Sequence, residues 1–271
     1  MKVLICTDAW YPQVNGVCRT LKNLGDELKK IGHDVEYIEP NLFFTIPMPK
    51  YNEIKLSLNV WPRVGTLIKK AKADVVHIAT EGPIGIFAKR YCVKNNIKFT
   101  TSYHTQFDKY LKLYYPYLPI KLAQKFLKNF HKKAEKILVT TQSMKEELEE
   151  IGFNKDQMVV WTRGANHSSF QNPKKINLEY KRPIFLYVGR VSIEKNIRAF
   201  LDLDLDGTKL IVGKGPDLTK LKKEYPSAIF KGERTNGELA SYFASSDVFV
   251  FPSKTDTFGI VIIEALKCGL P

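Results

Sequence analysis

The hydrophobic positions along this chain fall into two alternating patterns. Short apolar runs rich in β-branched and aromatic residues are followed by stretches with apolar residues at helical spacing. The runs predict buried strands of a parallel sheet, and the stretches predict helices between consecutive strands, which together indicate an α/β fold. The strands are predicted at residues 2–7, 34–38, 74–79, 97–103, 136–141, 157–161, 184–188, 209–212, 228–230 and 247–251.

A polar stretch at residues 170–175 interrupts this alternation and predicts a linker. We therefore expect two domains, residues 1–173 and residues 174–271. The chain stops just after Gly269, a typical helix-terminating residue, before further strands have followed. The C-terminal domain is accordingly expected to be truncated.

The composition narrows the class of protein. With 44% hydrophobic and 26% charged residues, the chain is typical of a globular protein and not of a disordered one. Its net charge of +14 predicts an anionic partner: nucleic acid, a nucleotide or an acidic membrane surface. The four cysteines show no CxxC spacing, which is typical of reduced thiols in a cytosolic protein, and no apolar run approaches the length of a membrane span.

Much of the positive charge lies in residues 109–133, which hold seven lysines. The apolar residues of 118–133 recur at helical spacing, with four lysines on the other side. This pattern predicts a helix that lies on an anionic lipid surface. A helix packed on its own sheet with a solvated lysine face explains the pattern equally well. The apolar residues are Leu122, Phe126, Leu127 and Phe130, and the lysines are Lys121, Lys125, Lys128 and Lys132.

The last twenty residues, 252–271, carry the most informative pattern. A loop with Asp256 and Gly259 follows a predicted strand, and a helix with Glu264 follows the loop. Apolar residues up to Leu266 cover more than one face of that helix, so we expect it to be largely buried and Glu264 to need a partner. A strand, a loop and a helix N-terminus together are typical of a phosphate or sugar site.

This segment resembles the E-x7-E motif of retaining glycosyltransferases of family 4, with Asp256 in place of the first Glu and Glu264 as the second. The resemblance continues along the whole chain in family order. It is carried by the segments Asp8-Ala-Trp-Tyr-Pro, Ile78-Ala-Thr-Glu-Gly-Pro, Ser102-Tyr-His-Thr, Tyr187-Val-Gly-Arg with Glu194-Lys195, and Thr255-Asp-Thr-Phe-Gly. All of these segments except Tyr187-Val-Gly-Arg with Glu194-Lys195 look like the bacterial branch with α-mannosyltransferases and sulfoquinovosyl- or glucosyl-diacylglycerol synthases.

The resemblance implies a GT-B fold, in which two Rossmann-like domains face each other across a cleft. It implies transfer of a hexosyl unit from a UDP- or GDP-sugar with retention of configuration, without a metal and without a cofactor. The residues it implies for catalysis are His104 beside the donor sugar and, at the leaving diphosphate, Arg190 and Lys195. For a diphosphate leaving group, two cations are chemically suitable because they stabilise the negative charge that develops.

The other site residues also follow from the resemblance. The donor is expected to contact glycine loops, the C-terminal motif and a segment at 231–238 near the base. The donor-binding residues are Gly16, Gly213, Gly215, Asp256, Thr257, Phe258, Gly259 and Glu264. The acceptor-side residues are Asn15, Glu81 and Tyr103.

We expect the acceptor to be a membrane lipid such as diacylglycerol or a phosphoinositide, and the protein to be cytoplasmic and peripheral on the inner face of the plasma membrane. Two alternatives stay open: a catalytically incomplete nucleotide-sugar-binding fragment, and a mannosyltransferase with a soluble acceptor. A nucleic-acid binder is not expected, because no nucleic-acid motif accompanies the charge. The sequence has no GxGxxG, P-loop, zinc or Ser-His-Asp pattern, so a dehydrogenase or a kinase is not supported.

Overall fold

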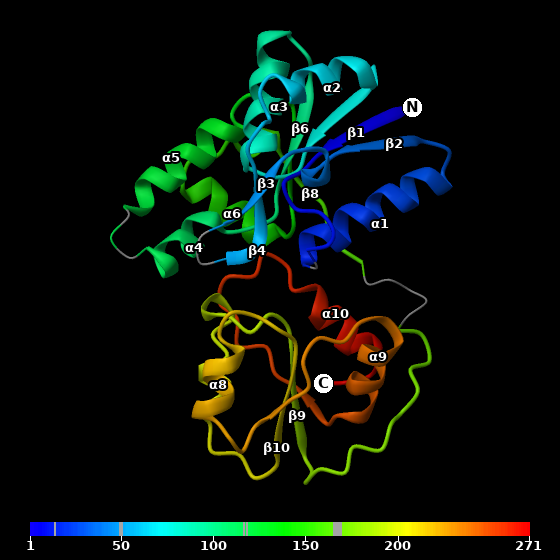
Figure 1. The fold of residues 1–271 in the computed structure, drawn as a ribbon, viewed down its shortest axis with the longest axis vertical. Helices are drawn as coiled ribbons and strands as arrows, with labels where there is room; N and C mark the ends of the chain where they lie inside the picture. The colour runs from blue at the N-terminus through cyan, green and yellow to red at the C-terminus, as the bar shows by residue number, and fades with distance from the viewer. Residues whose placement is uncertain (14, 49–50, 116, 118, 165–169) are drawn as a thin grey trace. The chain divides into compact units, whose positions relative to one another are not determined.

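The computed structural model describes residues 1–271 apart from 14, 49–50, 116, 118 and 165–169 (Figure 1). It divides into a first unit, Met1–Arg163, and a second unit, Gly164–Pro271. This division lies earlier than the predicted boundary at residue 173. The reason is visible at Phe170, which is 4% exposed and packs against Phe243 in the core of the second unit.

The first unit contains a six-stranded sheet in the order β2-β1-β5-β6-β7-β8, in which every neighbouring pair is parallel. Each of these strands lies within a predicted one, so the apolar runs are confirmed as strands. The bounds are β1 Lys2–Cys6, β2 Asp34–Ile38, β5 Val75–Ile78, β6 Phe99–Tyr103, β7 Ile137–Val139 and β8 Met158–Val160.

This sheet is buried on both faces. Successive residues of a strand point to opposite sides, and in β1 Leu4 and Cys6 join one apolar core while Val3 and Ile5 join another. Helices α2 and α3 pack together, as do α4 and α5 (Figure 1). The bounds are α1 Gly16–Lys30, α2 Arg63–Ala71, α3 Pro83–Lys94, α4 Phe107–Tyr114, α5 Ile120–His131 and α6 Gln142–Glu150, with short 3₁₀ turns at Pro40–Leu42 and Lys155–Gln157.

One pair of strands was not predicted from the sequence. Strands β3, Thr45–Met48, and β4, Tyr51–Ser57, form an antiparallel pair with a register shift between Pro47 and Met48. Proline lacks the N–H group that a ladder needs, so Pro47 argues against a strand on sequence grounds. This pair forms a separate two-stranded sheet.

The second unit contains a parallel sheet in the order β11-β10-β9-β12. Its strands match the predicted ones, although the last is shorter than residues 247–251 because only Val248 and Phe249 pair with β9. The bounds are β9 Ile184–Val188, β10 Thr208–Val212, β11 Ile229–Phe230, β12 Val248–Phe249, α7 Arg198–Leu201, α8 Leu218–Glu224, α9 Asn236–Ser245 and α10 Ile260–Lys267, with a 3₁₀ turn at Ile193–Lys195.

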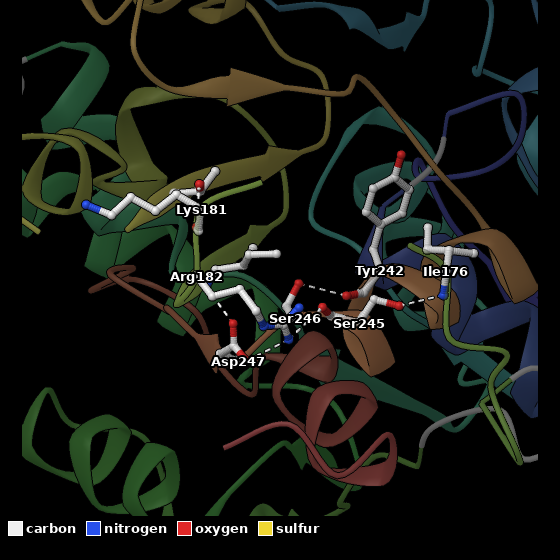
Figure 2. A network of polar contacts seen from close by, with 9 residues as sticks. Ile176, Lys181, Arg182, Tyr242, Ser245, Ser246 and Asp247 are labelled. Atoms are coloured by element: carbon white, nitrogen blue, oxygen red, sulfur yellow. Dashed lines mark hydrogen bonds and ion pairs between the residues drawn. The ribbon is translucent and has the colours of Figure 1, made fainter. Parts of the chain in front are cut away.

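Polar contacts fasten the amino edge of this second sheet (Figure 2). The Asp247 carboxylate, directly before β12, accepts from the Arg182 guanidinium at 2.7 Å and from the Ile184 backbone N–H at 2.7 Å. The Ser245 hydroxyl accepts from the backbone N–H of Ile176 at 2.8 Å. The starts of β9 and β12 are thereby joined, and Arg182 connects them to the end of α9 by donating to the Ser245 carbonyl at 3.4 Å. The loops at the opposite, carboxyl edge carry the predicted site residues.

The prediction for helix α10 is partly wrong. Leu266 is 63% exposed, although the sequence suggested that it is buried. Glu264 is 3% exposed and Ala265 is 1% exposed. Residues two positions apart lie on nearly opposite sides of a helix, so Glu264 and Leu266 cannot both face the core.

Among the residues that the structure describes, no helix is both long enough and apolar enough to cross a bilayer.

Candidate functional site

The strand order of the second unit indicates its candidate binding edge. The chain moves outward from β9 through β10 to β11 and then returns to place β12 on the other side of β9. In open parallel sheets, ligands bind at the carboxyl ends of the strands where the order reverses in this way. The loops after β9 and β12 meet at that point, and they carry Arg190, Lys195 and Asp256.

Glycine residues allow the loops after β9 and β10 to touch through their backbones. A Cβ atom on Gly213 would lie 1.8 Å from the carbonyl oxygen of Gly189, and one on Gly215 would lie 2.2 Å from that of Val191. The Val191 N–H donates to the Lys214 carbonyl at 2.9 Å. The two glycines predicted to contact the donor therefore have a packing reason to be glycine, and their contact with a nucleotide stays a prediction.

An ion pair joins the two loops at the reversal point. Nζ of Lys195 lies 2.5 Å from Oδ1 of Asp256, and the two side chains are only 18% and 21% exposed. Oδ2 of Asp256 is buried and has no hydrogen-bond partner among the residues described. The sequence predicted both residues for the site but not that they are paired.

Further contacts fix the same loops. The Asn196 amide donates to the Pro252 carbonyl at 3.0 Å, and the Thr255 hydroxyl donates to the Glu194 carbonyl at 3.2 Å. Glu194 is 2% exposed and accepts from the Ser192 hydroxyl at 2.6 Å. The sequence analysis gave Glu194 no role of its own. The Ser-x-Glu spacing after a strand was the signal that could have indicated this buried turn.

Helix α10 begins at the same edge. Gly259 precedes it with φ of 74°, in the left-handed region where glycine is favoured, and it offers no side chain to cap the helix. A Cβ atom there would lie 2.9 Å from Cδ1 of Ile262. The first N–H groups of α10 thus have the geometry of an anion site, with the buried Glu264 one turn further along.

In the first unit, the strand order reverses between β1 and β5. Asn15 and Gly16 follow β1, and Glu81 follows β5, so the fold brings these predicted residues to one edge. Asn15 caps helix α1, because its Oδ1 accepts from the Cys18 N–H at 2.9 Å. Its observed contact is therefore structural, while a contact with an acceptor stays a prediction.

Asp8 is a residue of this edge that the sequence analysis missed. Its carboxylate accepts from the Ile84 N–H at 2.8 Å, from the Gly85 N–H at 3.2 Å and from the Thr80 hydroxyl at 2.8 Å. It thereby caps helix α3 from the loop that follows β1. Burial raises the pKa of Asp8 to about 6, although these hydrogen bonds act to lower it. Gly82 leaves room for the carboxylate, since a Cβ atom there would lie 2.5 Å from Cγ of Asp8.

Glu81 is held by a buried histidine that the sequence analysis also missed. Nε2 of His131 lies 3.2 Å from Oε1 of Glu81, and Nδ1 of His131 lies 2.8 Å from the Thr101 hydroxyl. The Glu81 side chain is 12% exposed and His131 is fully buried. The last turn of α5 therefore positions a carboxylate of the predicted acceptor side.

His104 directly follows β6 and is half-buried. Its Nδ1 lies 3.0 Å from Nη2 of Arg163, whose guanidinium stacks 3.9 Å from the Trp161 ring centroid. Burial, and then the Arg163 charge, hold the pKa of His104 well below its usual range, so the imidazole is neutral near pH 7. Arginine can only donate, so Nδ1 accepts and the imidazole proton lies on Nε2.

Tyr103 is placed differently from the expectation. It is 2% exposed, belongs to the core of the first unit, and its hydroxyl lies 3.5 Å from Oδ1 of Asp108. Strand residues alternate between faces, so Tyr103 points into the core whereas His104 follows the end of the strand. The structure does not bring Tyr103 to a surface that an acceptor could reach.

In the basic segment 109–133, helix α5 packs on its own unit and leaves part of its apolar surface exposed, and its contact with a membrane stays a prediction. Leu127 is fully buried and Phe130 is 2% exposed, so α5 packs on its own unit. Leu122 and Phe126 remain 59% and 39% exposed. Positions 116 and 118 of this segment lie outside the described residues. In the part that is described, no group of three or more His, Cys, Asp and Glu side chains is arranged to hold a metal ion.

The chain matches two family models. Glycosyltransferase Family 4 matches residues 14–169, which is more than half of the chain. Glycosyl transferases group 1 matches residues 168–271.

Among curated proteins, the chain is 29% identical over 275 residues to the sulfoquinovosyl transferase of Arabidopsis thaliana, covering 93% of this chain but only 54% of that protein. It is 26% identical over 297 residues to a GDP-mannose-dependent alpha-mannosyltransferase of Mycobacterium tuberculosis, covering 100% of this chain and 78% of that protein. It is 25% identical over 310 residues to the alpha-monoglucosyldiacylglycerol synthase of Streptococcus pneumoniae, covering 100% and 70%.

Solved structures resemble the chain over its whole length. Sucrose-phosphate synthase from Thermosynechococcus elongatus superposes with a TM-score of 0.75 at 19% identity, covering 100% of this chain and 80% of that one. Anabaena HepE in complex with UDP and glucose superposes with a TM-score of 0.69 at 14% identity, covering 100% and 79%. At these identities the likeness establishes the fold alone.

Proposed function

Because the chain belongs to glycosyltransferase family 4 and has a GT-B fold, we propose that it transfers a hexosyl unit from a nucleoside-diphosphate sugar to an acceptor hydroxyl, forming an α-glycosidic bond. The observation that carries this proposal is the Lys195–Asp256 pair at the point where the strand order reverses. A cation that would suit the diphosphate lies there beside a carboxylate that would suit sugar hydroxyls.

In the proposed reaction, the acceptor oxygen forms a bond to C1 of the sugar while the bond from C1 to the phosphate oxygen breaks. The electron pair of that bond leaves with the diphosphate, and the acceptor proton passes to a phosphate oxygen on the same face of the sugar. Arg190 and Lys195 stabilise the charge on the diphosphate, without a metal. Their effect is larger at a site as little exposed as that of Lys195, because such charges are less screened by water.

Binding of the donor would change the partners of the ion pair. A diphosphate carries more negative charge than Asp256 and can replace it at Nζ of Lys195. Both oxygens of Asp256 then accept from donor hydroxyls, beginning with Oδ2, which is already without a partner in the described part of the chain. Glu264 accepts from the ribose, and the N–H groups near Phe258 and Gly259 bind sugar and phosphate.

The proposed role of His104 follows from its tautomer. With the proton on Nε2, the neutral imidazole can donate a hydrogen bond to a hydroxyl of the donor sugar. Glu81 stays the proposed acceptor-side carboxylate, because His131 holds it near the end of β5. Tyr103 acts at most on the position of its neighbours, since its own side chain lies in the core.

We propose a membrane lipid, such as diacylglycerol or a phosphoinositide, as the acceptor. Two of the relatives are named for sulfoquinovosyl transfer and for monoglucosyldiacylglycerol synthesis. The exposed Leu122 and Phe126 among the lysines of α5 suit contact with an anionic bilayer at the cytoplasmic face. The mannosyltransferase relatives make GDP-mannose the first donor to try beside UDP-sugars.

The test is product identification. The protein is incubated with labelled UDP-glucose, UDP-sulfoquinovose or GDP-mannose, a membrane lipid extract and EDTA, and any labelled product is analysed for its acceptor and anomeric configuration. We expect an α-linked glycolipid from one donor, and none from the Arg190→Ala/Lys195→Ala double variant. A β-linked product would contradict retention, a labelled water-soluble product would replace the lipid acceptor, and donor binding without any product would indicate a binding protein.

A further inference from the structure

A groove of about 570 Å³ lies between helices α3 and α5 of the first unit. All of its lining residues lie on these two helices or just after α5, and none belongs to the carboxyl edge of the sheet. They are Ile86, Lys89, Arg90, Val93, Lys94, Phe126, Asn129, Phe130 and Lys133. Its volume is in the range typical of sites for small molecules.

The groove exposes apolar side chains that a helix pair normally buries. Ile86, Val93 and Phe126 are 37%, 41% and 39% exposed, and the buried Phe130 also lines the groove. Contiguous exposed apolar surface with a polar rim marks an interaction site in soluble proteins. Burying these side chains against a hydrocarbon chain would be favourable.

All charged side chains of the polar rim are basic. Four of the nine lining residues are cationic, one is an asparagine, and none is acidic. Lys89 is fixed in place, because its Nζ donates to the Asn129 carbonyl at 2.6 Å and lies 5.6 Å from the Phe130 ring centroid. Arg90, Lys94 and Lys133 are exposed at the rim. Such a rim attracts an anionic group and repels a cationic one.

We propose that this groove binds one anionic phospholipid of the membrane, with the head-group phosphate on Arg90, Lys94 and Lys133 and an acyl chain against Ile86, Val93 and Phe126. This lipid is not the acceptor of the proposed reaction, because the groove shares no residue with the predicted acceptor side. The groove is also distinct from the lysine face of α5, which would attract any anionic bilayer. Lys121 and Lys125 belong to that face and do not line the groove. An acidic amphipathic helix is the less suitable occupant, since it needs an apolar groove that accommodates several of its turns.

Monomeric short-chain lipids test the groove without a bilayer. We would titrate the protein calorimetrically with dihexanoyl phosphatidylglycerol, with dihexanoyl phosphatidylcholine and with glycerol 3-phosphate, each below its micelle concentration where one exists. The expected result is saturable binding of one phosphatidylglycerol per chain, with binding of the zwitterionic lipid and of the chainless phosphate weaker by at least about tenfold.

Two triple variants with the same change of charge locate the site. Arg90→Gln/Lys94→Gln/Lys133→Gln removes three positive charges of the rim. It should weaken the binding of phosphatidylglycerol by about a hundredfold, since each cation near an anionic lipid contributes about 1 kcal/mol. The control, Lys121→Gln/Lys125→Gln/Lys128→Gln, changes the lysine face outside the groove. It should change the affinity for phosphatidylglycerol by less than about twofold. Phe126→Ser should weaken binding by about tenfold without lowering the melting temperature, because Phe126 is already partly exposed.

Several results would overturn the proposal. Equal losses in the two triple variants would show that binding depends on overall charge and not on the groove. Glycerol 3-phosphate binding as tightly as the lipid would remove the role of the acyl chain. Binding of an acidic amphipathic peptide, but of no lipid, would assign the groove to a protein partner. Because every readout is binding without turnover, failure here is distinct from failure of the proposed transferase activity.

Discussion

At the scale of single residues, the main feature of the candidate site is the ion pair between Lys195 and Asp256. The sequence predicted both residues and gave them separate roles, one at the phosphate and one at the sugar. It could not predict that they form an ion pair across 61 positions of the chain, because that depends on β12 lying beside β9. The shorter Asp, in place of the Glu of the family motif, is the carboxylate that pairs with Lys195.

Removing either cation should slow the reaction. We expect Arg190→Ala and Lys195→Ala each to lower kcat by about a hundredfold, because each removes a charge that stabilises the leaving diphosphate. Turnover is measured with EDTA present, and Lys222→Ala, which removes an exposed lysine of α8, serves as the matched control. Full activity in either site variant, or a strict requirement for a divalent ion in the wild type, would exclude the metal-free mechanism.

Glu264 is predicted to act on the donor more than on folding. It is 3% exposed within an apolar helix. Glu264→Ala should abolish donor binding while the melting temperature falls by only a few degrees, and Glu264→Gln, which keeps the volume, should lose binding with a smaller change in melting. Calorimetric titration with the donor and thermal unfolding are compared for both variants. Parallel losses of binding and melting temperature would make Glu264 a structural acid.

The residues that the sequence analysis missed share one physical feature. Asp8 and His131 act through buried contacts to residues that are 76 and 50 positions away. Nothing in their local sequence indicates these partners, because the order of strands in the sheet creates the contact. Asn15, by contrast, caps the helix that directly follows it, and local sequence signals such contacts.

At the scale of elements, the strands were predictable because their apolar runs are buried on both faces. β1 contributes alternate residues to two cores, which is why its sequence is continuously apolar. The β3–β4 pair lacks that signal and contains Pro47, so it was missed. In α5 the helical period was correct, but it could not tell that Leu127 is buried while Leu122 is exposed.

The lysine face of α5 gives a prediction at this scale. If it lies on a membrane, the protein should sediment with vesicles that contain anionic lipid and not with zwitterionic vesicles, and added salt should weaken this association. Lys121→Gln/Lys125→Gln/Lys128→Gln should release most of the protein, because each lysine contributes about 1 kcal/mol. The control for this variant must leave Lys94 unchanged, because Lys94 lines the groove.

The control for sedimentation is Lys29→Gln/Lys69→Gln/Lys222→Gln. It changes the net charge by the same amount as the α5 variant, but at lysines of α1, α2 and α8. This variant should remain bound to anionic vesicles. If the α5 variant sediments as well as the wild type, its lysines form an ordinary solvated face, and a soluble acceptor becomes the better hypothesis.

At the scale of the whole molecule, the alternation of strands and helices predicted two α/β domains, and the resemblance supplied the GT-B arrangement. The sequence did not predict the order of strands in either sheet, which decides where each binding edge lies. It also could not locate the division near residue 163, because the packing of Phe170 into the second core is not a local property.

The stability of the whole chain should depend on pH through groups of opposite sign, of which His77 and Asp8 are one pair; His104 acts in the same direction as His77. Burial, and then the Arg163 charge, lower the pKa of His77 to about 4, whereas burial raises the pKa of Asp8 to about 6. Between pH 6.5 and 4 the unfolded chain binds a proton at residue 77 that the folded chain does not, so His77 makes stability fall as pH falls. Between about pH 6 and 3.8 the folded chain holds the extra proton at Asp8, so Asp8 makes stability rise as pH falls.

Unfolding free energies measured across pH 4 to 7 check this prediction. His77→Gln should reduce the loss of stability on acidification by at most about 1.4 kcal/mol per pH unit, and Asp8→Asn should increase it. His33→Gln, at a histidine whose Nδ1 lies 3.5 Å from the N-terminal nitrogen, serves as the control. Identical pH profiles for wild type and both variants would contradict the assignment of these pKa shifts.

The most direct measurement for the whole account is equilibrium binding of UDP and GDP to the wild-type protein, to Lys195→Ala and to Lys222→Ala, by calorimetry in EDTA. The account predicts that one of the two nucleotides binds once per chain, that Lys195→Ala weakens it by about tenfold to a hundredfold, and that Lys222→Ala leaves it unchanged. Binding of neither nucleotide, or equal affinity in wild type and Lys195→Ala, would contradict the claim that the carboxyl edge of the second unit holds the diphosphate of a nucleotide sugar.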